Sequence, residues 1–502
     1  MTFNSIDFLL FFPIIVGIYF LIPQKLKYIW LLVTSYYFVA SFSTQEDKYL
    51  GVKSLFMLIV CTMISYIFAL WMKKQEDPRK KKNIFRAGII SDLLILLFFK
   101  YFDFILLNVN SFLGIFRMKE LHNPINILLP LGISYYIFQT IGYMADVYKD
   151  KAEPEKNLLR YALFIGFFPK FSQGPIERST NLMKQIREME ERRLWDYEKI
   201  VSGVCLMAWG MFQKMVIADR CAVYVDAVHN NLFSAGTVET VSAAILFSIC
   251  IYCDFAGYSS IAVGAARVMG FSLTDNFDTP YFATSIADFW HRWHISLSTW
   301  LRDYIYIPLG GSRCSKIKKY RNIMITFLLS GLWHGASWTY VLWGGIHGLY
   351  QVIGDLLKPV REKINTRFHV KTEAFSYTFG KILITFGLTT FAWIFFKVES
   401  FENLVLYFNR MFTRFNPWVL SASGLDYLGV NLKDVALVAV FLLIFFVGEI
   451  ARYVCKTDMG TFLTAQNIWF RGGVLLLLIL MILVFGEYGI NFDSKQFLYM
   501  KY

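Results

Sequence analysis

Four of the seven histidines of this chain lie between residues 291 and 347, in segments otherwise rich in apolar and aromatic residues. They are His291, His294, His334 and His347. Imidazole exchanges its proton near neutral pH, so a histidine can take the proton from a hydroxyl group during acyl transfer. Ionisable side chains are costly in an apolar environment, which favours a functional interpretation. We therefore expect a catalytic site here, with one imidazole as base and a second that orients or polarises.

The first two histidines lie in the stretch ADFWHRWHISLSTWLRDYIYIPLGG, residues 287–311. His291 and His294 are three residues apart, so a helix would place them on one face. No acidic partner follows at helical spacing, and we therefore predict no metal site. A belt of interfacial aromatic residues would explain the tryptophans alone, but not two histidines beside an Arg–Asp pair.

His334 lies in the second stretch, SGLWHGASWTYVLWGGIHGLYQ, residues 330–351. Its small neighbours Gly331 and Gly335 would let backbone or a thin substrate approach closely. The structural alternative is a histidine satisfied by a hydrogen bond between helices. His347 would lie about 20 Å from His334 along a straight helix, so we expect it to be structural.

Other catalytic motifs are missing from the sequence. No GxSxG elbow marks a serine nucleophile, and no GxxxxGK[ST] loop indicates nucleotide hydrolysis. Cys250 and Cys253 have CxxC spacing without a second pair or a neighbouring histidine. We expect buried, reduced thiols at these two positions.

The composition is that of a polytopic membrane protein. The 502 residues are 56% hydrophobic and only 17% charged, whereas soluble domains are nearer 45–50% and about 25%. The net charge of +13 comes from short basic clusters between long apolar runs. Cytoplasmic loops of membrane proteins have this pattern, so we predict no nucleic-acid partner. The partner implied by composition is the lipid bilayer.

We predict an all-α fold with about 11 spanning helices, together with broken or re-entrant helices. A spanning helix needs about 20 apolar residues. The clearest candidates are 7–23, 28–43, 54–72, 88–107, 200–217, 239–256, 379–398, 435–453 and 473–486. Four further stretches are apolar but interrupted by Gly, Pro, His or charge: 127–148, 158–176, 257–312 and 322–350.

The basic clusters predict the orientation of the chain. Basic residues after the first helix and in the run from Lys73 to Arg86 place the N-terminus outside. The loops 313–321 and 358–371 are both basic, yet a single crossing at 322–350 would separate them. Either 322–350 crosses twice as short broken helices, or one loop is an exception. Irregular backbone at membrane depth requires burial in protein or a cavity, which predicts the interior site in this region.

These stretches resemble the membrane-bound O-acyltransferase family, in the branch of bacterial alginate and related polysaccharide O-acetyltransferases. The WHG around His334 and the FWHRWHISLSTWLRDYIYIPLGG block carry the resemblance. It extends over nearly the whole chain, and the segments that support it are FFKYFDF, LPLGISYYIFQTIGYMADVY, FPKFSQGPIER, FAWIFFKVESFENL and the closing FLYMKY. The resemblance implies one family domain over 1–502, with its core motif region at about 127–350.

Carried over residue by residue, the resemblance implies that His334 and His294 are the catalytic pair. It also implies a central tunnel that joins the two membrane faces. The side chains expected to shape its walls are His291, Trp290, Trp293, Ser298, Arg302, Asp303, Tyr304, Trp333 and Gln139. Weaker candidates for binding the phosphates of coenzyme A are Arg313, Lys316, Lys318, Lys319 and Arg321, which membrane orientation explains equally well.

The implied function is O-acetylation of an exported or cell-surface polysaccharide, from the bacterial plasma membrane. Acetyl-CoA would be the donor, with no permanently bound cofactor, and an extracytoplasmic partner of the SGNH-hydrolase type would receive the acetyl group. One alternative within the family is D-alanyl transfer from a carrier protein to teichoic acid. An alternative of another class is a transporter or glycan exporter whose histidines line a permeation path. Paired half-helices in two equivalent chain halves would support the transporter.

Overall fold

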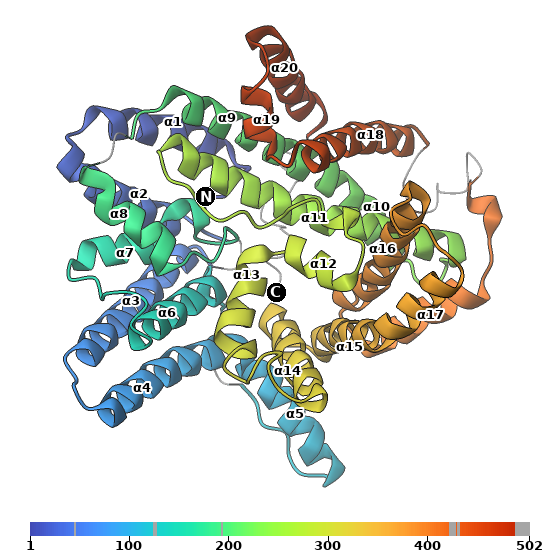
Figure 1. Ribbon diagram of the computed structural model, residues 1–502, viewed down its shortest axis with the longest axis horizontal. Coiled ribbons are helices and arrows are strands. Elements are labelled where there is room, and N and C mark those ends of the chain that lie inside the picture. Colours follow the sequence, from blue (N-terminus) through green and yellow to red (C-terminus); the bar gives the residue numbers. More distant parts are fainter. Residues whose placement is uncertain (45–46, 124–127, 192–193, 421–427, 429–431, 487–502) are drawn as a thin grey trace. The chain divides into compact units, whose positions relative to one another are not determined.

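A computed structural model describes residues 1–502 except 45–46, 124–127, 192–193, 421–427, 429–431 and 487–502. Helices are the only regular secondary structure of the described residues (Figure 1). The all-α prediction is therefore confirmed for this part of the chain. The closing FLYMKY motif lies outside the described residues.

The chain divides into two compact units, residues 1–204 with 262–274, and residues 205–261 with 275–502. The helices α9 and α11 contribute to both units, and a single domain over 1–502 stays a prediction. The first unit contains α1 (Ile6–Leu21), α2 (Lys27–Ala40), α3 (Leu50–Lys73), α4 (Pro78–Leu96), α5 (Phe102–Ile115), α6 (Ile133–Tyr148), α7 (Leu158–Gly166), α8 (Lys184–Arg187) and the start of α9 (Tyr197–Met211). The second contains α10 (Asp219–Asn230), most of α11 (Thr237–Val268), α12 (Ile286–Arg292), α13 (Ile295–Leu301), α14 (Lys316–His334), α15 (Trp338–Arg367), α16 (Phe375–Lys397), α17 (Phe401–Thr413), α18 (Leu432–Cys455), α19 (Met459–Thr464) and α20 (Ile468–Phe485).

Short 3-10 and π-helical turns connect or interrupt these helices. The π-helical turns are η2 (Leu97–Tyr101), η4 (Ser179–Met183), η6 (Phe212–Ala218) and η8 (Arg302–Tyr306). The 3-10 turns are η1 (Gln24–Leu26), η3 (Phe168–Lys170), η5 (Glu188–Glu190), η7 (Pro280–Phe282) and η9 (Pro417–Leu420).

Six helices of the described residues are long and apolar enough to cross a membrane. They are α3, the continuous helix from α9 to α10, α11, α16, α18 and α20. These helices coincide with six of the nine clearest predicted spans. The other three predicted spans are also helical, but α1 and α2 are shorter, and η2 divides 88–107 between α4 and α5.

The predicted stretch 322–350 folds as a helical hairpin of α14 and α15. The chain reverses at residues 335–337, where Gly335 is extended and the Ser337 side chain caps α15 by accepting from the Thr339 N–H. At the far end of the hairpin, Lys319 and Asp355 form an ion pair of 2.8 Å. The two helices are thus antiparallel, and the basic loops 313–321 and 358–371 lie at the same end of the hairpin. The stretch thus contains two helices, as one of the two alternatives predicted, but they are longer than the short broken helices of that alternative. That each of them crosses the membrane stays a prediction.

Glycines let α14 and α15 pack with their backbones in contact. A Cβ atom on Gly331 would lie 2.2 Å from the carbonyl oxygen of Tyr340, and one on Gly344 would lie 2.2 Å from that of Phe327. Both distances are far below van der Waals contact, so a side chain there must separate the helices. The same contacts fix the rotation of α14 about its axis, and hence the direction in which its other residues point.

We expect Gly344→Ala to destabilise the protein by about 1–3 kcal/mol, because the added methyl group overpacks the hairpin. Gly354→Ala, on the same helix, is the matched control, since no atom lies within 4 Å of the Cβ position there. Alanine at this site should stabilise by up to about 1 kcal/mol through helix propensity. Thermal unfolding in detergent measures both variants, and equal shifts would contradict the close packing at Gly344.

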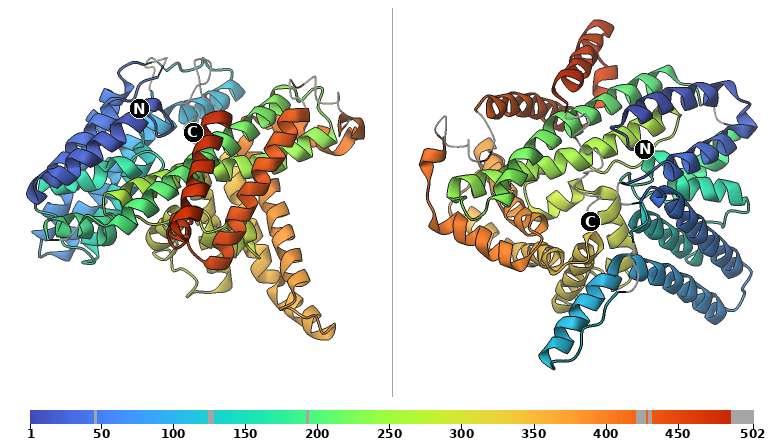
Figure 2. Two further views of the ribbon diagram at one scale, coloured as in Figure 1. Left: turned by 90° about the horizontal axis from the view of Figure 1, so that it is seen from above. Right: turned by 180° about the vertical axis from the view of Figure 1, so that it is seen from behind.

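The hairpin continues into α16, which runs antiparallel to α15. Figure 2 shows α15 and α16 side by side as a long pair. Ring contacts between His347 and Trp393, and a hydrogen bond from Asn365 to Tyr377 (2.9 Å), connect them at both ends. The three helices α14, α15 and α16 therefore form one packed layer.

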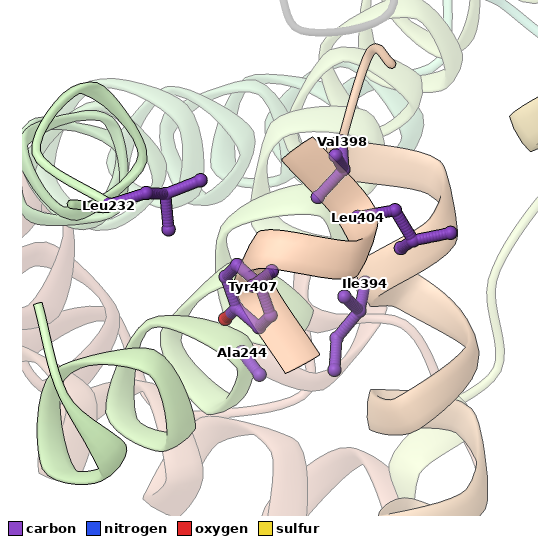
Figure 3. Packing of buried hydrophobic residues seen from close by; sticks show 6 residues of the cluster. All are labelled: Leu232, Ala244, Ile394, Val398, Leu404 and Tyr407. Carbon is purple, nitrogen blue, oxygen red and sulfur yellow. The ribbon is translucent and has the colours of Figure 1, made fainter. Parts of the chain in front are cut away.

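The C-terminal end of α16 is held by a hydrophobic cluster with α17 and the start of α11 (Figure 3). Its buried members are Leu232, Ala244, Ile394, Val398, Leu404 and Tyr407. The Tyr407 hydroxyl also donates to the Thr240 carbonyl oxygen at 2.5 Å. This cluster fixes the position of Phe396, which packs against the candidate site.

An ion cluster is buried where η6 packs within the second unit. The Lys214 ammonium lies 2.8 Å from Asp219 and 2.5 Å from Asp254, and all three side chains are at most 7% exposed. Gly210 and Gly257 allow the close approach of the two helix backbones beside this cluster. Asp254 precedes Phe255, which contacts His294, so the cluster anchors the part of α11 that packs on the candidate site.

Candidate active site

His334 is the last residue of α14 and lies at the turn of the hairpin. Its side chain is buried, with 4% exposure. Aromatic rings surround it: Trp333 and Trp343 at centroid distances of 5.0 Å, and Phe396 at 5.4 Å. These contacts come from α14, α15 and α16, so the whole three-helix layer positions this imidazole.

His294 lies between α12 and α13 with its backbone in the left-handed region, at φ 43° and ψ 55°. This conformation is costly for a residue with a Cβ atom, and such strain concentrates at functional sites. The side chain is fully buried, and its ring packs edge-on against Phe255 at 4.6 Å. The left-handed residue ends one short helix and starts the next, which sets the direction of the ring.

The strained turn at His294 is held by Asn276. The backbone oxygen of Asn276 accepts from the Ile295 N–H at 3.0 Å, and its side-chain oxygen accepts from the Ser296 hydroxyl at 2.7 Å. Asn276 itself is 2% exposed. These hydrogen bonds stabilise the turn, and they offset the free-energy cost of the left-handed backbone conformation at His294.

The two imidazoles face each other within the second unit. The ring centroids of His294 and His334 are 6.4 Å apart, with planes inclined by 52°, and Trp333 contacts both rings. Two neutral or singly charged imidazoles at this separation can act on one substrate group between them, one as base and one as orienting group.

A cavity of about 360 Å³ lies between α12, α13, η8, α14 and α15; His294 and His334 do not line it, but their chain neighbours Ile295 and Ser330 do. One wall is a stripe on α14, formed by Lys319, Ile323, Thr326, Phe327 and Ser330. Successive members are separated by one, three or four residues, and the next positions on this face are Trp333 and His334. The opposite wall comes from α12, α13 and η8 and includes Trp290, His291, Ile295, Ser298 and Arg302. Ile295 directly follows His294, so both walls lead toward the histidine pair.

Positive charge lies at the end of the cavity remote from the histidines. Arg302 is 53% exposed, and its Nε atom lies 2.9 Å from Asp303. Lys319, outside the apolar stretch 322–350, pairs with Asp355, and this hydrogen bond raises the pKa of Lys319. Lys319 therefore stays charged at neutral pH. Guanidinium and ammonium groups such as those of Arg302 and Lys319 are suited to phosphate groups.

The predicted wall residues fall into several groups. Trp290, His291, Ser298 and Arg302 line the cavity, while Trp333 contacts the histidine pair. Trp293 packs instead in an aromatic cluster, with Trp393 at 4.9 Å. Asp303 contacts the cavity residue Arg302, and Tyr304 packs on Trp300 at 5.1 Å. Neither Asp303 nor Tyr304 lines the cavity.

Gln139 belongs to the first unit. Its amide nitrogen donates to the Phe164 carbonyl oxygen at 2.9 Å, and its amide oxygen accepts from the buried ammonium of Lys170. The histidines belong to the second unit. The structure thus shows Gln139 hydrogen-bonded within the first unit. Its role in the candidate site stays a prediction.

The basic candidates for phosphate binding are also divided. Lys319 alone lines the cavity. The remaining four, Arg313, Lys316, Lys318 and Arg321, are exposed. Arg321 donates to Asn322, whose side chain in turn donates to the Leu309 and Gly311 carbonyl oxygens.

His347 lies closer to His334 than a straight helix would place it, because the chain reverses between them. A single ring, Trp343, contacts both histidines at 5.0 Å. His347 is fully buried, and its Nδ1 atom accepts from the indole nitrogen of Trp290 at 3.2 Å. His347 thus stabilises the position of Trp290, which lines the cavity.

The structure adds residues that the sequence analysis missed. Ser330 and Gln351 line the cavity, Asn276 holds the His294 turn, and Trp343 with Phe396 packs on His334. Ser330, Trp343 and Gln351 lie in the stretch 330–351, but nothing in the sequence separates them from its other residues. Asn276 and Phe396 come from other segments and have no local signal. In the described part of the chain, no three His, Cys, Asp or Glu side chains form a metal-binding group, and Cys250 and Cys253 are buried free thiols.

Comparisons with known proteins show which family and which relatives this chain is similar to. The profile of the membrane-bound O-acyltransferase family matches residues 148–396. The probable alginate O-acetylase AlgI of Pseudomonas aeruginosa is 35% identical over 423 residues, covering 84% of this chain and 76% of the relative. The peptidoglycan O-acetyltransferase of Helicobacter pylori is 32% identical over 402 residues, covering 75% and 72%. The teichoic acid D-alanyltransferase of Bacillus subtilis is 28% identical over 344 residues, covering 65% and 81%.

The fold and the matches define a multi-pass membrane acyltransferase. The chain belongs to the membrane-bound O-acyltransferase family. Its relatives include enzymes named for O-acetyl transfer to alginate and to peptidoglycan.

Proposed function

We propose that this protein moves an acetyl group from acetyl-CoA in the cytoplasm toward an exported or cell-surface polysaccharide. The observation that carries the proposal is the buried, facing pair His294 and His334, approached by a cavity with cations at its remote end. The relatives named as O-acetyltransferases support acetyl as the group transferred. The donor is a substrate, and no resident cofactor is needed.

In the proposed reaction, the donor thioester enters through the cavity, with its phosphates on Arg302 and Lys319. His334 takes the proton of an acceptor hydroxyl as the oxygen attacks the thioester carbonyl carbon. The new C–O bond forms, the C–S bond breaks, and the proton passes to the departing thiolate. His294 orients or polarises the reacting groups from the facing side. Trp290, His291 and Ser298 shape the donor path.

The remaining parts of the proposal concern the membrane. We place the N-terminus outside and the loops 313–321 and 358–371 in the cytoplasm, which the positive-inside pattern and the α14–α15 hairpin support. About 11 spans around a central tunnel would let the donor and the acceptor approach from opposite faces. An extracytoplasmic partner of the SGNH-hydrolase type would take the acetyl group to the glycan.

Incubation of the purified protein with radiolabelled acetyl-CoA and an extracytoplasmic partner or hydroxyl acceptor tests this function. We expect acceptor-dependent release of coenzyme A with transfer of the label. Labelled D-alanyl carrier protein is the parallel donor, because the relative named as a teichoic acid D-alanyltransferase favours it as the second candidate. Transfer from that donor alone would replace acetyl-CoA in the proposal. Movement of intact glycan across vesicles without any acyl transfer would favour the transporter.

A further inference from the structure

Ser330 has an unusual setting for a serine in a helix. Its side chain is 1% exposed and lines the cavity. Its hydroxyl has no hydrogen-bond partner among the described residues. Buried helical hydroxyls usually donate to the carbonyl oxygen four residues earlier. Thr326 and Thr299 do so at 2.7 Å from the two walls of the same cavity. The Ser330 hydroxyl is therefore available to a molecule in the cavity.

The direction of Ser330 is fixed by the packing of α14. Its neighbour Gly331 contacts the backbone of α15 so closely that a Cβ atom would lie 2.2 Å from the Tyr340 oxygen. Successive residues of a helix are rotated by about 100°. With Gly331 against α15, Ser330 points in a different direction, and its side chain lines the cavity. A buried polar group without a partner costs about 1–3 kcal/mol, which a ligand bond would offset.

Ser330 also lies at the inner end of the cavity, next to the catalytic pair. It is one helical turn, about 6 Å along the axis, before His334 on the same face of α14. Lys319, which carries positive charge at the other end, lies about 16 Å away along the same helix. A donor bound with its phosphates near Lys319 would therefore bring its acyl group to Ser330.

We propose that the Ser330 hydroxyl donates a hydrogen bond to the carbonyl oxygen of the thioester. This inference rests on the function proposed above. As the acceptor oxygen attacks the carbonyl carbon, negative charge gathers on the carbonyl oxygen, and the hydroxyl stabilises it. Ser330 keeps its own proton. The carbonyl re-forms when the C–S bond breaks, and the proton from the acceptor leaves with the thiolate.

Ser330→Ala tests this role. We expect the kcat for acetyl transfer to fall about 10²–10³-fold, the effect of removing one donor to a developing oxyanion. We expect Ser330→Cys, which keeps a weak donor of similar shape, to fall between wild type and Ser330→Ala. Inhibition by free coenzyme A should be unchanged, because coenzyme A lacks the acyl carbonyl group.

Ser248→Ala is the matched control for loss of a buried hydroxyl. Ser248 is fully buried in α11 and donates to the Ala244 oxygen, away from the cavity residues. We expect it to keep full kcat. A Ser330→Ala enzyme with wild-type kcat would overturn the inference and leave the proposed function intact. A weaker inhibition by coenzyme A with unchanged kcat would also overturn it, because Ser330 would then contact the coenzyme A part of the donor and not the acyl carbonyl group. A wild-type protein without acyl transfer from any donor would instead remove the proposed function itself.

Discussion

The His334→Ala variant is expected to lose acetyl transfer by about 10³-fold, within the range for loss of a general base. The imidazole lies in a shell of aromatic rings beside His294. Alanine cannot accept the proton of the attacking hydroxyl. Transfer of label from acetyl-CoA measures the loss under saturating donor.

Two further variants distinguish the loss of the base at His334 from the loss of its side-chain packing. His334→Gln keeps a polar side chain of similar length in the aromatic shell, and it should lose as much activity as His334→Ala. His122→Ala removes an exposed histidine in a loop and should leave transfer unchanged. Thermal unfolding checks that each variant is folded. An active His334→Ala enzyme would exclude His334 as the base.

The largest expected effect on stability comes from Lys214→Met. Removing the ammonium leaves Asp219 and Asp254 buried side by side without the cation, and breaking a buried ion pair costs about 3–5 kcal/mol. We also expect lower activity, since Asp254 is adjacent to Phe255, which packs on His294. The free energy of unfolding in detergent, with increasing denaturant, measures the main effect.

An ion pair with an exposed lysine provides the control for Lys214. Lys53 is 64% exposed and pairs with Asp47 in a loop. Lys53→Met should change stability by less than about 1 kcal/mol. Neutralising all three members, Lys214→Met with Asp219→Asn and Asp254→Asn, should recover part of the lost stability, because no buried charge is left without a partner. A Lys214→Met protein as stable as wild type would show that the cluster contributes little.

The membrane class and most helices were predictable because they depend on local composition. An apolar run such as 54–72 forms a helix wherever it lies, since the backbone in lipid must satisfy its own hydrogen bonds. The predicted spans 379–398 and 435–453 coincide with α16 and α18 for the same reason. The conflict between the two basic loops also pointed to the hairpin region before its geometry was known.

The histidines were predictable for a similar reason, because an ionisable residue in an apolar segment is visible in the sequence itself. His294 and His334, 40 positions apart along the chain, do face each other at 6.4 Å. Other members of the site were not visible. The Ser330 hydroxyl could not be distinguished from the many helical hydroxyls that donate to their own backbone, such as Thr326.

By itself, the amino-acid sequence determined a helical membrane protein of the O-acyltransferase family, with four histidines in a broken apolar region. Tertiary structure alone decided how those histidines are arranged. The reversal at residues 335–337 brings His347 back behind the wall, Asn276 holds the strained turn at His294, and Gly331 with Gly344 sets the rotation of α14. The contacts of Asn276, Gly331 and Gly344 join residues that are 9 to 20 positions apart in the chain. These contacts depend on close packing and on backbone conformation. The pattern of apolar residues that predicts the helices predicts neither of them.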